Sequence, residues 1–202
     1  MPNSKRDWSQ FALLLIDIQE DFWPKERLAH FPDFPGNIAR LLAFCRERGI
    51  EVIHLRARFK QDMSDWMVRY KLEGAIPCVE GTDGAKPLPW ALERSGEKVI
   101  VKTTFDGFHH PELARYLRQR GKRFVLTAGL VTSICVLFTT VSAAQLGFLA
   151  AVIEDCCAAR PVQHAQALDT YGFIFDRVTL DGIPDRYVEW MADLEKLHST
   201  KV

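Results

Sequence analysis

Three residues of the sequence have side chains that together can carry out hydrolysis through a covalent intermediate. Asp17 and Lys102 each directly follow a short apolar run, and Cys135 follows a third such run after a short turn. A carboxylate can accept a proton, a deprotonated thiol is a strong nucleophile, and a cation stabilises negative charge that develops during a reaction. These are the ingredients of acyl transfer, in which an acyl group passes first to sulfur and then to water.

Each of the three residues also has an ordinary structural interpretation. Asp17 alone is compatible with a carboxylate that caps a loop, Lys102 with a lysine whose amine reaches water at the rim of a sheet, and Cys135 with a small buried core residue. Burying a carboxylate is costly unless a cation lies beside it, and Lys102 would be that cation for Asp17. Spacing alone therefore leaves the catalytic and the structural interpretations both open.

The position of Cys135 near the start of a predicted helix favours the catalytic interpretation. We predict that Thr132 is the N-cap of a helix that runs to about Leu146. Cys135 would then lie in the first helical turn, where free backbone N–H groups and the helix dipole favour a thiolate. The same N–H groups would bind the oxyanion of a tetrahedral intermediate.

The elements that position these residues alternate between strand and helix along the chain. Six short runs rich in Val, Ile, Leu and Phe are predicted strands, and their nearly continuous apolar character is typical of strands buried on both faces. This alternation indicates a three-layer α/β/α fold of the Rossmann-like type, with a six-stranded, mostly parallel sheet. The predicted strands span residues 11–16, 51–56, 98–101, 123–128, 148–153 and 177–180, and the predicted helices span 37–48, 111–120, 132–146, 161–171 and 183–197.

The predicted sheet would bring the three reactive residues together. The carboxyl ends of parallel strands meet at one edge of a sheet, and ligands bind there. Asp17, Lys102 and Cys135 follow three different predicted strands at that edge. The length is that of one ordinary domain, so we predict a single domain over residues 1–202.

One segment does not fit the alternation of strands and helices. Residues 59–89 carry several Gly and Pro residues with little periodicity, and a segment this long within a compact domain is usually a functional one, such as a lid or a pocket wall. Aromatic side chains suit the walls of small-molecule pockets, whereas Arg58 and Arg69 are better explained as solvated surface residues. The predicted substrate-binding residues are Phe22, Trp23, Trp66, Phe105 and Phe108.

The composition argues against several other classes of protein. The chain of 202 residues has 26 Lys and Arg and 26 Asp and Glu, and this balance gives no electrostatic signature of binding to nucleic acid or to an anionic membrane. No apolar run approaches the ~20 residues that span a bilayer, and the N-terminal run is too short for a secretory signal. Five irregularly spaced cysteines indicate reduced thiols. We therefore expect a cytoplasmic protein that binds neither nucleic acid nor membrane.

Other titratable residues have structural interpretations. His54 lies within a predicted strand and is expected to be a hydrogen-bonded core histidine, whereas Asp155 is expected to accept hydrogen bonds from loop N–H groups. The neighbours His109–His110 would point in different directions and lack a third ligand, which argues against a metal site. Cys156–Cys157 end an apolar run and are expected to be inert buried thiols.

Four segments of the chain, in the right order, resemble the isochorismatase-like cysteine hydrolases. The likeness extends from about Phe11 to Leu180, and Glu154 and Asp155 after the fifth predicted strand also fit the pattern. The four segments are Leu14–Phe22 (LLIDIQEDF), Gly81–Ala85 (GTDGA), Val99–Phe108 (VIVKTTFDGF) and Gly129–Val136 (GLVTSICV).

The resemblance implies a reaction and a set of roles. In such enzymes the residue that corresponds to Asp17 takes the thiol proton of Cys135, the thiolate attacks an amide carbonyl to form a thioester, and Lys102 completes the catalytic set. It also implies a cis peptide bond between Leu130 and Val131, which would let the N–H groups of Val131 and Cys135 form the oxyanion hole. A homodimer or homotetramer is expected on the same grounds.

Two departures from relatives narrow the expected reaction. The nicotinamidases of this superfamily carry an Asp-x-His metal motif where this sequence has Ala57 and Phe59, and neither side chain can ligate a metal ion. We therefore expect no cofactor and no nicotinamidase activity. Enzymes of the superfamily that cleave an enol ether generally lack the cysteine, so Cys135 favours hydrolysis of a C–N bond in a small amide, ureide or carbamoyl compound.

Three alternatives to this amidohydrolase remain open at the level of sequence. One is an isochorismatase-type hydrolase of an enol ether, and another is a non-catalytic protein that binds a small molecule on the same scaffold. The third is a thiol redox protein that uses Cys135. The presence of Asp17 and Lys102 beside Cys135 favours the enzyme over the binding protein, and the lack of a suitably placed resolving cysteine weakens the redox alternative.

Overall fold

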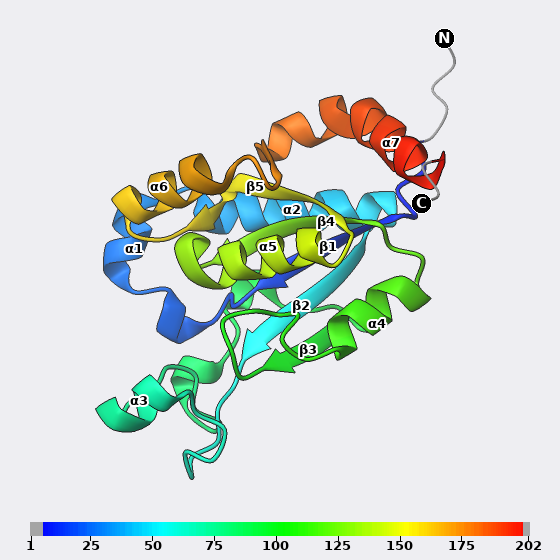
Figure 1. The fold of residues 1–202 in the computed structure, drawn as a ribbon. Helices are drawn as coiled ribbons and strands as arrows, with labels where there is room; N and C mark the ends of the chain where they lie inside the picture. Colours follow the sequence, from blue (N-terminus) through cyan, green and yellow to red (C-terminus); the bar gives the residue numbers. More distant parts are fainter. Residues whose placement is uncertain (1–5, 200–202) are drawn as a thin grey trace.

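The computed structural model describes residues 6–199 and contains one six-stranded sheet (Figure 1). The strand order is β3-β2-β1-β4-β5-β6, and every neighbouring pair is parallel. The predicted α/β sheet is thus confirmed, and it is parallel throughout rather than mostly so. The strands are β1 (Phe11–Ile16), β2 (Glu51–Ala57), β3 (Lys98–Lys102), β4 (Phe124–Leu130), β5 (Leu149–Ala158) and β6 (Asp176–Val178).

Helices cover both faces of the sheet, as Figure 1 shows. On one face α2 and α7 bury apolar side chains, and on the other face α4, α5 and α6 do so. The short helices α1 and α3 bury no side chain fully. The helices are α1 (Lys25–His30), α2 (Phe34–Arg48), α3 (Val68–Glu73), α4 (Glu112–Gln119), α5 (Leu137–Gln145), α6 (Pro161–Tyr171) and α7 (Ile183–Ser199).

The two-sided covering explains why the strands have almost no polar residues. In β1, Leu13 and Leu15 pack with α2 and α7, whereas Leu14 and Ile16 pack with α4 and α5. Successive side chains of a strand point to opposite faces, so a strand that is covered on both faces needs apolar residues at every position. All six residues of β1 are buried.

Gly129 lets the end of β4 approach the end of β1 closely. Its φ is 129°, and a Cβ atom at this position would lie 2.0 Å from the carbonyl oxygen of Ile16. The pairing of β4 with β5 shifts register between Thr127 and Gly129. Only glycine combines this backbone conformation with this contact, and the contact lies directly beside Asp17.

The segment 59–89 differs from the expectation of a purely irregular segment. It contains the helix α3 and a short 3-10 turn at Asp83–Ala85, and Figure 1 shows α3 projecting from the sheet beyond the end of β2. An isolated bridge between Gln19 and Pro87 joins the segment to the rest of the chain, and a second bridge, between Phe59 and Val79, lies within it. No helix among residues 6–199 is long and apolar enough to cross a bilayer.

Candidate active site

Asp17 and Lys102 form a buried ion pair at the carboxyl edge of the sheet. Asp17 follows β1, Lys102 ends β3, and 2.7 Å separates Asp17 Oδ2 from Lys102 Nζ. Their side chains are 0% and 3% exposed, respectively. Lys102 Nζ also donates to the carbonyl oxygen of Thr104 at 2.9 Å. The pair satisfies the requirement that a buried charge have a partner.

The two oxygens of the Asp17 carboxylate have different partners. Oδ1 accepts the backbone N–H of Ala57 at 2.9 Å. Oδ2 touches Lys102 but receives no aligned hydrogen bond from residues 6–199. A carboxylate oxygen that keeps a free lone pair can accept a proton. Asp17 itself has a φ of 50°, a left-handed conformation that is uncommon for non-glycine residues but is adopted by Asp more often than by most.

Cys135 lies beside this pair, within hydrogen-bonding reach of both charged groups. Only 6% of the surface of Cys135 is exposed. Burial raises the pKa of the Cys135 thiol, the Asp17 carboxylate raises it further, and the Lys102 ammonium lowers it only in part. The resting group is therefore a thiol, not the thiolate that its place near a helix start predicts, because burial and the Asp17 charge both disfavour the thiolate.

Lys102 keeps its charge in this setting. Burial acts to lower the pKa of Lys102, but the negative charge of Asp17 outweighs that effect and raises the pKa. A permanent cation that contacts both the carboxylate and the sulfur can stabilise negative charge on either one. The three side chains can thus bind a proton, transfer it, and stabilise the negative charge that its transfer leaves behind.

The turn that carries Cys135 differs from the predicted helix start. The peptide bond between Leu130 and Val131 is cis, as expected, but Thr132–Val136 form a π-helical turn whose N-cap is Val131. The interpretation of Thr132 as an N-cap is wrong, because its hydroxyl lies 2.8 Å from Nδ1 of His164 in α6 instead of bonding its own turn. The backbone N–H of Val131 donates no hydrogen bond to another residue of the described chain.

An apolar pocket opens onto the three reactive groups. Its cavity volume is about 60 Å³. Of the predicted substrate-binding residues, Phe22 and Phe105 line it. The full lining is Asp17, Phe22, Ala57, Phe59, Met67, Tyr70, Ile76, Pro77, Lys102, Thr104, Phe105, Val131, Ile134 and Cys135.

The other three predicted substrate-binding residues lie away from this pocket, which corrects that expectation. Trp23 stacks on Phe34 of α2 and packs against the core. Trp66 donates its indole N–H to the carbonyl oxygen of Lys60 at 2.7 Å. Phe108 is buried between the sheet and its helices, next to Phe148. Each of these side chains has its partners within the fold.

The segment 59–89 supplies pocket residues that sequence reasoning did not identify. Met67 and Tyr70 come from the start of α3, and Ile76 and Pro77 follow its end. The Tyr70 ring packs edge to face on Phe105, and its hydroxyl has no hydrogen-bond partner among residues 6–199. Burial raises the pKa of Tyr70, and a charge on Cys135 adds to that rise.

Gln19 is a further residue that sequence reasoning missed. Its buried side chain accepts the N–H of Ala57 at 2.9 Å and donates to the carbonyl oxygens of Ala57 and Ala85 at 2.8 and 2.9 Å. It therefore fixes the peptide group whose N–H also holds Asp17. The signals in the sequence are its place two residues after Asp17 and its inclusion in the segment Leu14–Phe22, which resembles the family.

Two apolar residues of the pocket lie at the end of β2 and just after it. Ala57 and Phe59, which stand where the resemblance places the metal ligands of nicotinamidases, both line the pocket with apolar side chains. Among residues 6–199, no group of three or more His, Cys, Asp or Glu side chains is arranged to hold a metal ion.

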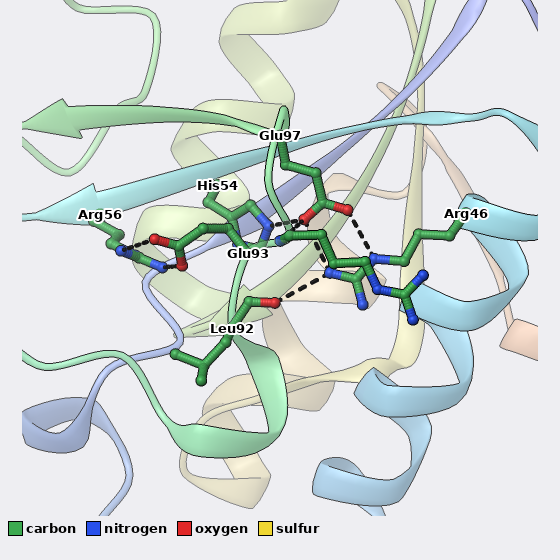
Figure 2. A network of polar contacts seen from close by, with 7 residues as sticks. Arg46, His54, Arg56, Leu92, Glu93 and Glu97 are labelled. Atoms are coloured by element: carbon green, nitrogen blue, oxygen red, sulfur yellow. Dashed lines mark hydrogen bonds and ion pairs between the residues drawn. The ribbon is translucent and has the colours of Figure 1, made fainter.

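His54 does not belong to the site. It lies in a polar network that joins β2, α2 and the residue before β3. Figure 2 shows Glu97 between His54 and Arg46. Glu97 accepts hydrogen bonds from Arg46 at 2.7 and 2.9 Å and lies 3.0 Å from His54 Nε2. Elsewhere, Asp155 accepts the N–H of Leu180 at 2.8 Å. Both residues have the structural roles expected from the sequence.

Comparisons with known proteins agree with this architecture. The Isochorismatase domain family matches residues 11–178. The crystal structure of an isochorismatase family protein from Desulfovibrio vulgaris superposes with a TM-score of 0.79 at 32% identity, over 87% of this chain and 97% of that one. Relatives include the maleamate amidohydrolase of Pseudomonas putida, 29% identical over 74% of this chain and 72% of that protein.

A probable inactive nicotinamidase of Arabidopsis thaliana is also similar, at 29% identity over 80% of this chain and 88% of that protein. The relatives thus include an amide hydrolase and one protein that is described as a probable inactive member. The match over most of the chain, with the shared fold, shows that this protein belongs to the isochorismatase family.

Proposed function

We propose that this protein is a metal-independent cysteine amidohydrolase, which cleaves a C–N bond of a small amide, ureide or carbamoyl compound through a thioester on Cys135. The observation that carries the proposal is the buried contact of Asp17 with Lys102, with the Cys135 thiol in reach of both at the end of an apolar pocket. Hydrolysis of amides by relatives supports the same reaction class.

The first half of the reaction forms the thioester. Asp17 Oδ2 accepts the proton of the Cys135 thiol while the sulfur attacks the carbonyl carbon. The N–H groups of Val131 and Cys135 are assigned to the resulting oxyanion, and Lys102 stabilises the negative charge near the sulfur. The tetrahedral intermediate then collapses, and the Asp17 carboxylic acid gives its proton to the leaving nitrogen, so that ammonia or an amine departs.

The second half of the reaction regenerates the enzyme. Asp17, again a carboxylate, takes a proton from a water molecule that attacks the thioester carbon. The C–S bond breaks, the carboxylic acid product leaves, and the proton on Asp17 returns to the sulfur. Because the resting thiol is protonated, proton transfer accompanies each attack, which is the role of a general base and acid.

Two other functions are compatible with family membership. The similarity to a probable inactive nicotinamidase keeps a non-catalytic binding protein as the second candidate, and an enol-ether hydrolase is the third. The reactive groups of a pure binding protein would have no reason to meet in one buried contact. Cleavage of an enol ether does not require a thiol beside the base.

The test is ammonia release from a panel of small amides, ureides and carbamoyl compounds. Turnover that persists in EDTA and is lost in Cys135→Ala is the expected result. A panel without turnover would favour the binding protein, and EDTA inhibition that added zinc reverses would contradict the metal-independent mechanism. Peroxide consumption with a thiol reductant, without ammonia release, would instead indicate a redox protein.

A further inference from the structure

We propose that the substrate of this site is a small uncharged amide with an apolar acyl chain, and that the pocket rejects amides whose acyl chain ends in a carboxylate. The proposal rests on the amidohydrolase function above and names its substrate class. Three features of the pocket carry it: the charges in its lining, its size, and the residues that form its walls.

The lining offers no free positive charge to a substrate carboxylate. Lys102 is its one cationic side chain, and Asp17 already neutralises it at 2.7 Å. The nearby Arg58 and Arg69 lie outside the lining, and the guanidinium of Arg69, 81% exposed, pairs with Glu73. A carboxylate in this cavity would be desolvated without a partner, and this opposes its binding.

The cavity is small. Its volume is about 60 Å³, which suits a short chain of bonded atoms better than a ring with substituents. Amides from propionamide to butyramide are of this size. Benzamide and nicotinamide, with a six-membered ring in addition to the amide group, exceed it.

The walls of the cavity are suited to an alkyl chain. Phe59, Met67, Ile76 and Phe105 face it from the segment 59–89 and from the loop after β3. Burial of apolar surface against such side chains contributes roughly 25 cal/mol per Å². Tyr70 offers an uncharged hydroxyl without a partner in the described chain, which suits the neutral polar atoms of an amide.

The first experiment compares butyramide with succinamate, which replaces the terminal methyl group by a carboxylate. We expect kcat/KM for butyramide to exceed that for succinamate by at least about 100-fold. It should also exceed kcat/KM for benzamide. Comparable or faster hydrolysis of succinamate would overturn the substrate class and leave the amidohydrolase function intact. Absence of turnover on every amide would instead contradict the function.

A second measurement tests the charge selectivity without turnover. The rates at which iodoacetamide and iodoacetate alkylate Cys135 at pH 9 are compared by peptide mapping, in the folded protein and in urea. We expect the ratio of the iodoacetamide rate to the iodoacetate rate to be at least about tenfold higher in the folded protein than in urea, since only the folded pocket excludes the carboxylate. Equal ratios in the two states would overturn the proposal.

A pair of variants on α3 and its N-cap sharpens the test. Met67→Arg places a guanidinium in the pocket wall, whereas Leu72→Arg places one on the outer side of the same helix, where the leucine is 78% exposed. We expect Met67→Arg to lower the iodoacetamide-to-iodoacetate ratio at Cys135 and Leu72→Arg to leave it unchanged. An unchanged ratio in folded Met67→Arg would contradict the charge argument.

Discussion

The carboxylate of Asp17 and the ammonium of Lys102 meet at 2.7 Å in a site that water scarcely reaches, with side chains 0% and 3% exposed. Oδ2 of Asp17 touches Lys102 without an aligned hydrogen bond, so the ion pair holds the carboxylate in place but leaves this oxygen able to accept a proton. One contact thus both positions the Asp17 carboxylate and leaves it able to take part in proton transfer.

Replacement of Lys102 tests this contact through stability. We expect Lys102→Met to lower the free energy of unfolding by about 3–5 kcal/mol, because the buried Asp17 carboxylate loses its partner. The double variant Asp17→Asn with Lys102→Met would recover much of the stability without activity. Urea unfolding measures both.

Lys98→Met provides the matched control, since Lys98 lies on the same strand and pairs with Glu112 near the surface. Exposed pairs contribute about 0–1 kcal/mol, so this variant should remain close to the wild type. Equal stability of Lys102→Met and Lys98→Met would show that the Asp17 contact is energetically unimportant.

The pH dependence of Cys135 alkylation separates charge from catalysis. Burial raises the pKa of this thiol and the Asp17 carboxylate raises it further, so the labelling rate should still be rising at pH 9. Asp17→Asn removes the negative charge and leaves Lys102 beside the sulfur, which should shift the labelling curve to lower pH while turnover is lost. A curve that moves to higher pH in Asp17→Asn would contradict this electrostatic account.

The Glu97 network predicts a pH-dependent contribution to stability. Burial acts to raise the pKa of Glu97, but hydrogen bonds from Arg46, from the Arg94 N–H and from His54 outweigh it and hold the pKa at about 2, below its ordinary 4.5. That difference corresponds to about 3 kcal/mol. Because the folded-state pKa is lowered, this stabilisation is complete above pH 4.5 and is lost as the pH falls toward 2.

Glu97→Gln should therefore be less stable than the wild type at pH 7, with the gap closing below pH 4.5. Urea unfolding between pH 3 and pH 7 measures the gap. The control is Glu93→Gln, since Glu93 pairs with Arg56 in the same region but is more exposed. A gap for Glu97→Gln that stays constant over this pH range would be inconsistent with the lowered pKa.

The close approach at Gly129 predicts a large loss of stability on adding one methyl group. The new Cβ atom of Gly129→Ala would lie 2.0 Å from the carbonyl oxygen of Ile16, at a φ of 129°. We expect a loss above about 3 kcal/mol, as for other strained core changes. Gly96→Ala is the control, since Gly96 also has a positive φ but open space around it. Thermal unfolding measures both variants, and an equal fall in melting temperature would argue against the steric explanation.

The strands were predictable because burial on both faces leaves a direct trace in the sequence. The predicted run 11–16 coincides with β1, and the other five strands all begin at the predicted position or within one residue of it, as in β2 and β3. The end of β5 was missed: it continues to Ala158 through residues such as Glu154 and Asp155, whose polar side chains interrupt the apolar pattern.

The pocket walls were harder to predict than the reactive groups. A large aromatic residue fits a core or a pocket equally well, so sequence did not separate Phe105, which lines the cavity, from Phe108, which is in the core. The helix α3 is too short for its periodicity to be recognised, and it carries Tyr70. The hydroxyl of Thr132 bonds to His164, a residue 32 positions away, and no local pattern reveals that contact.

The most direct test of the central claim is detection of the thioester. The most active amide of the panel is mixed with the protein, the reaction is quenched in acid within one turnover, and the Cys135 peptide is analysed by mass spectrometry. We predict an acyl group on Cys135 that disappears on further turnover, with no adduct and no ammonia release in Cys135→Ala. Ammonia release that persists in Cys135→Ala would contradict the account.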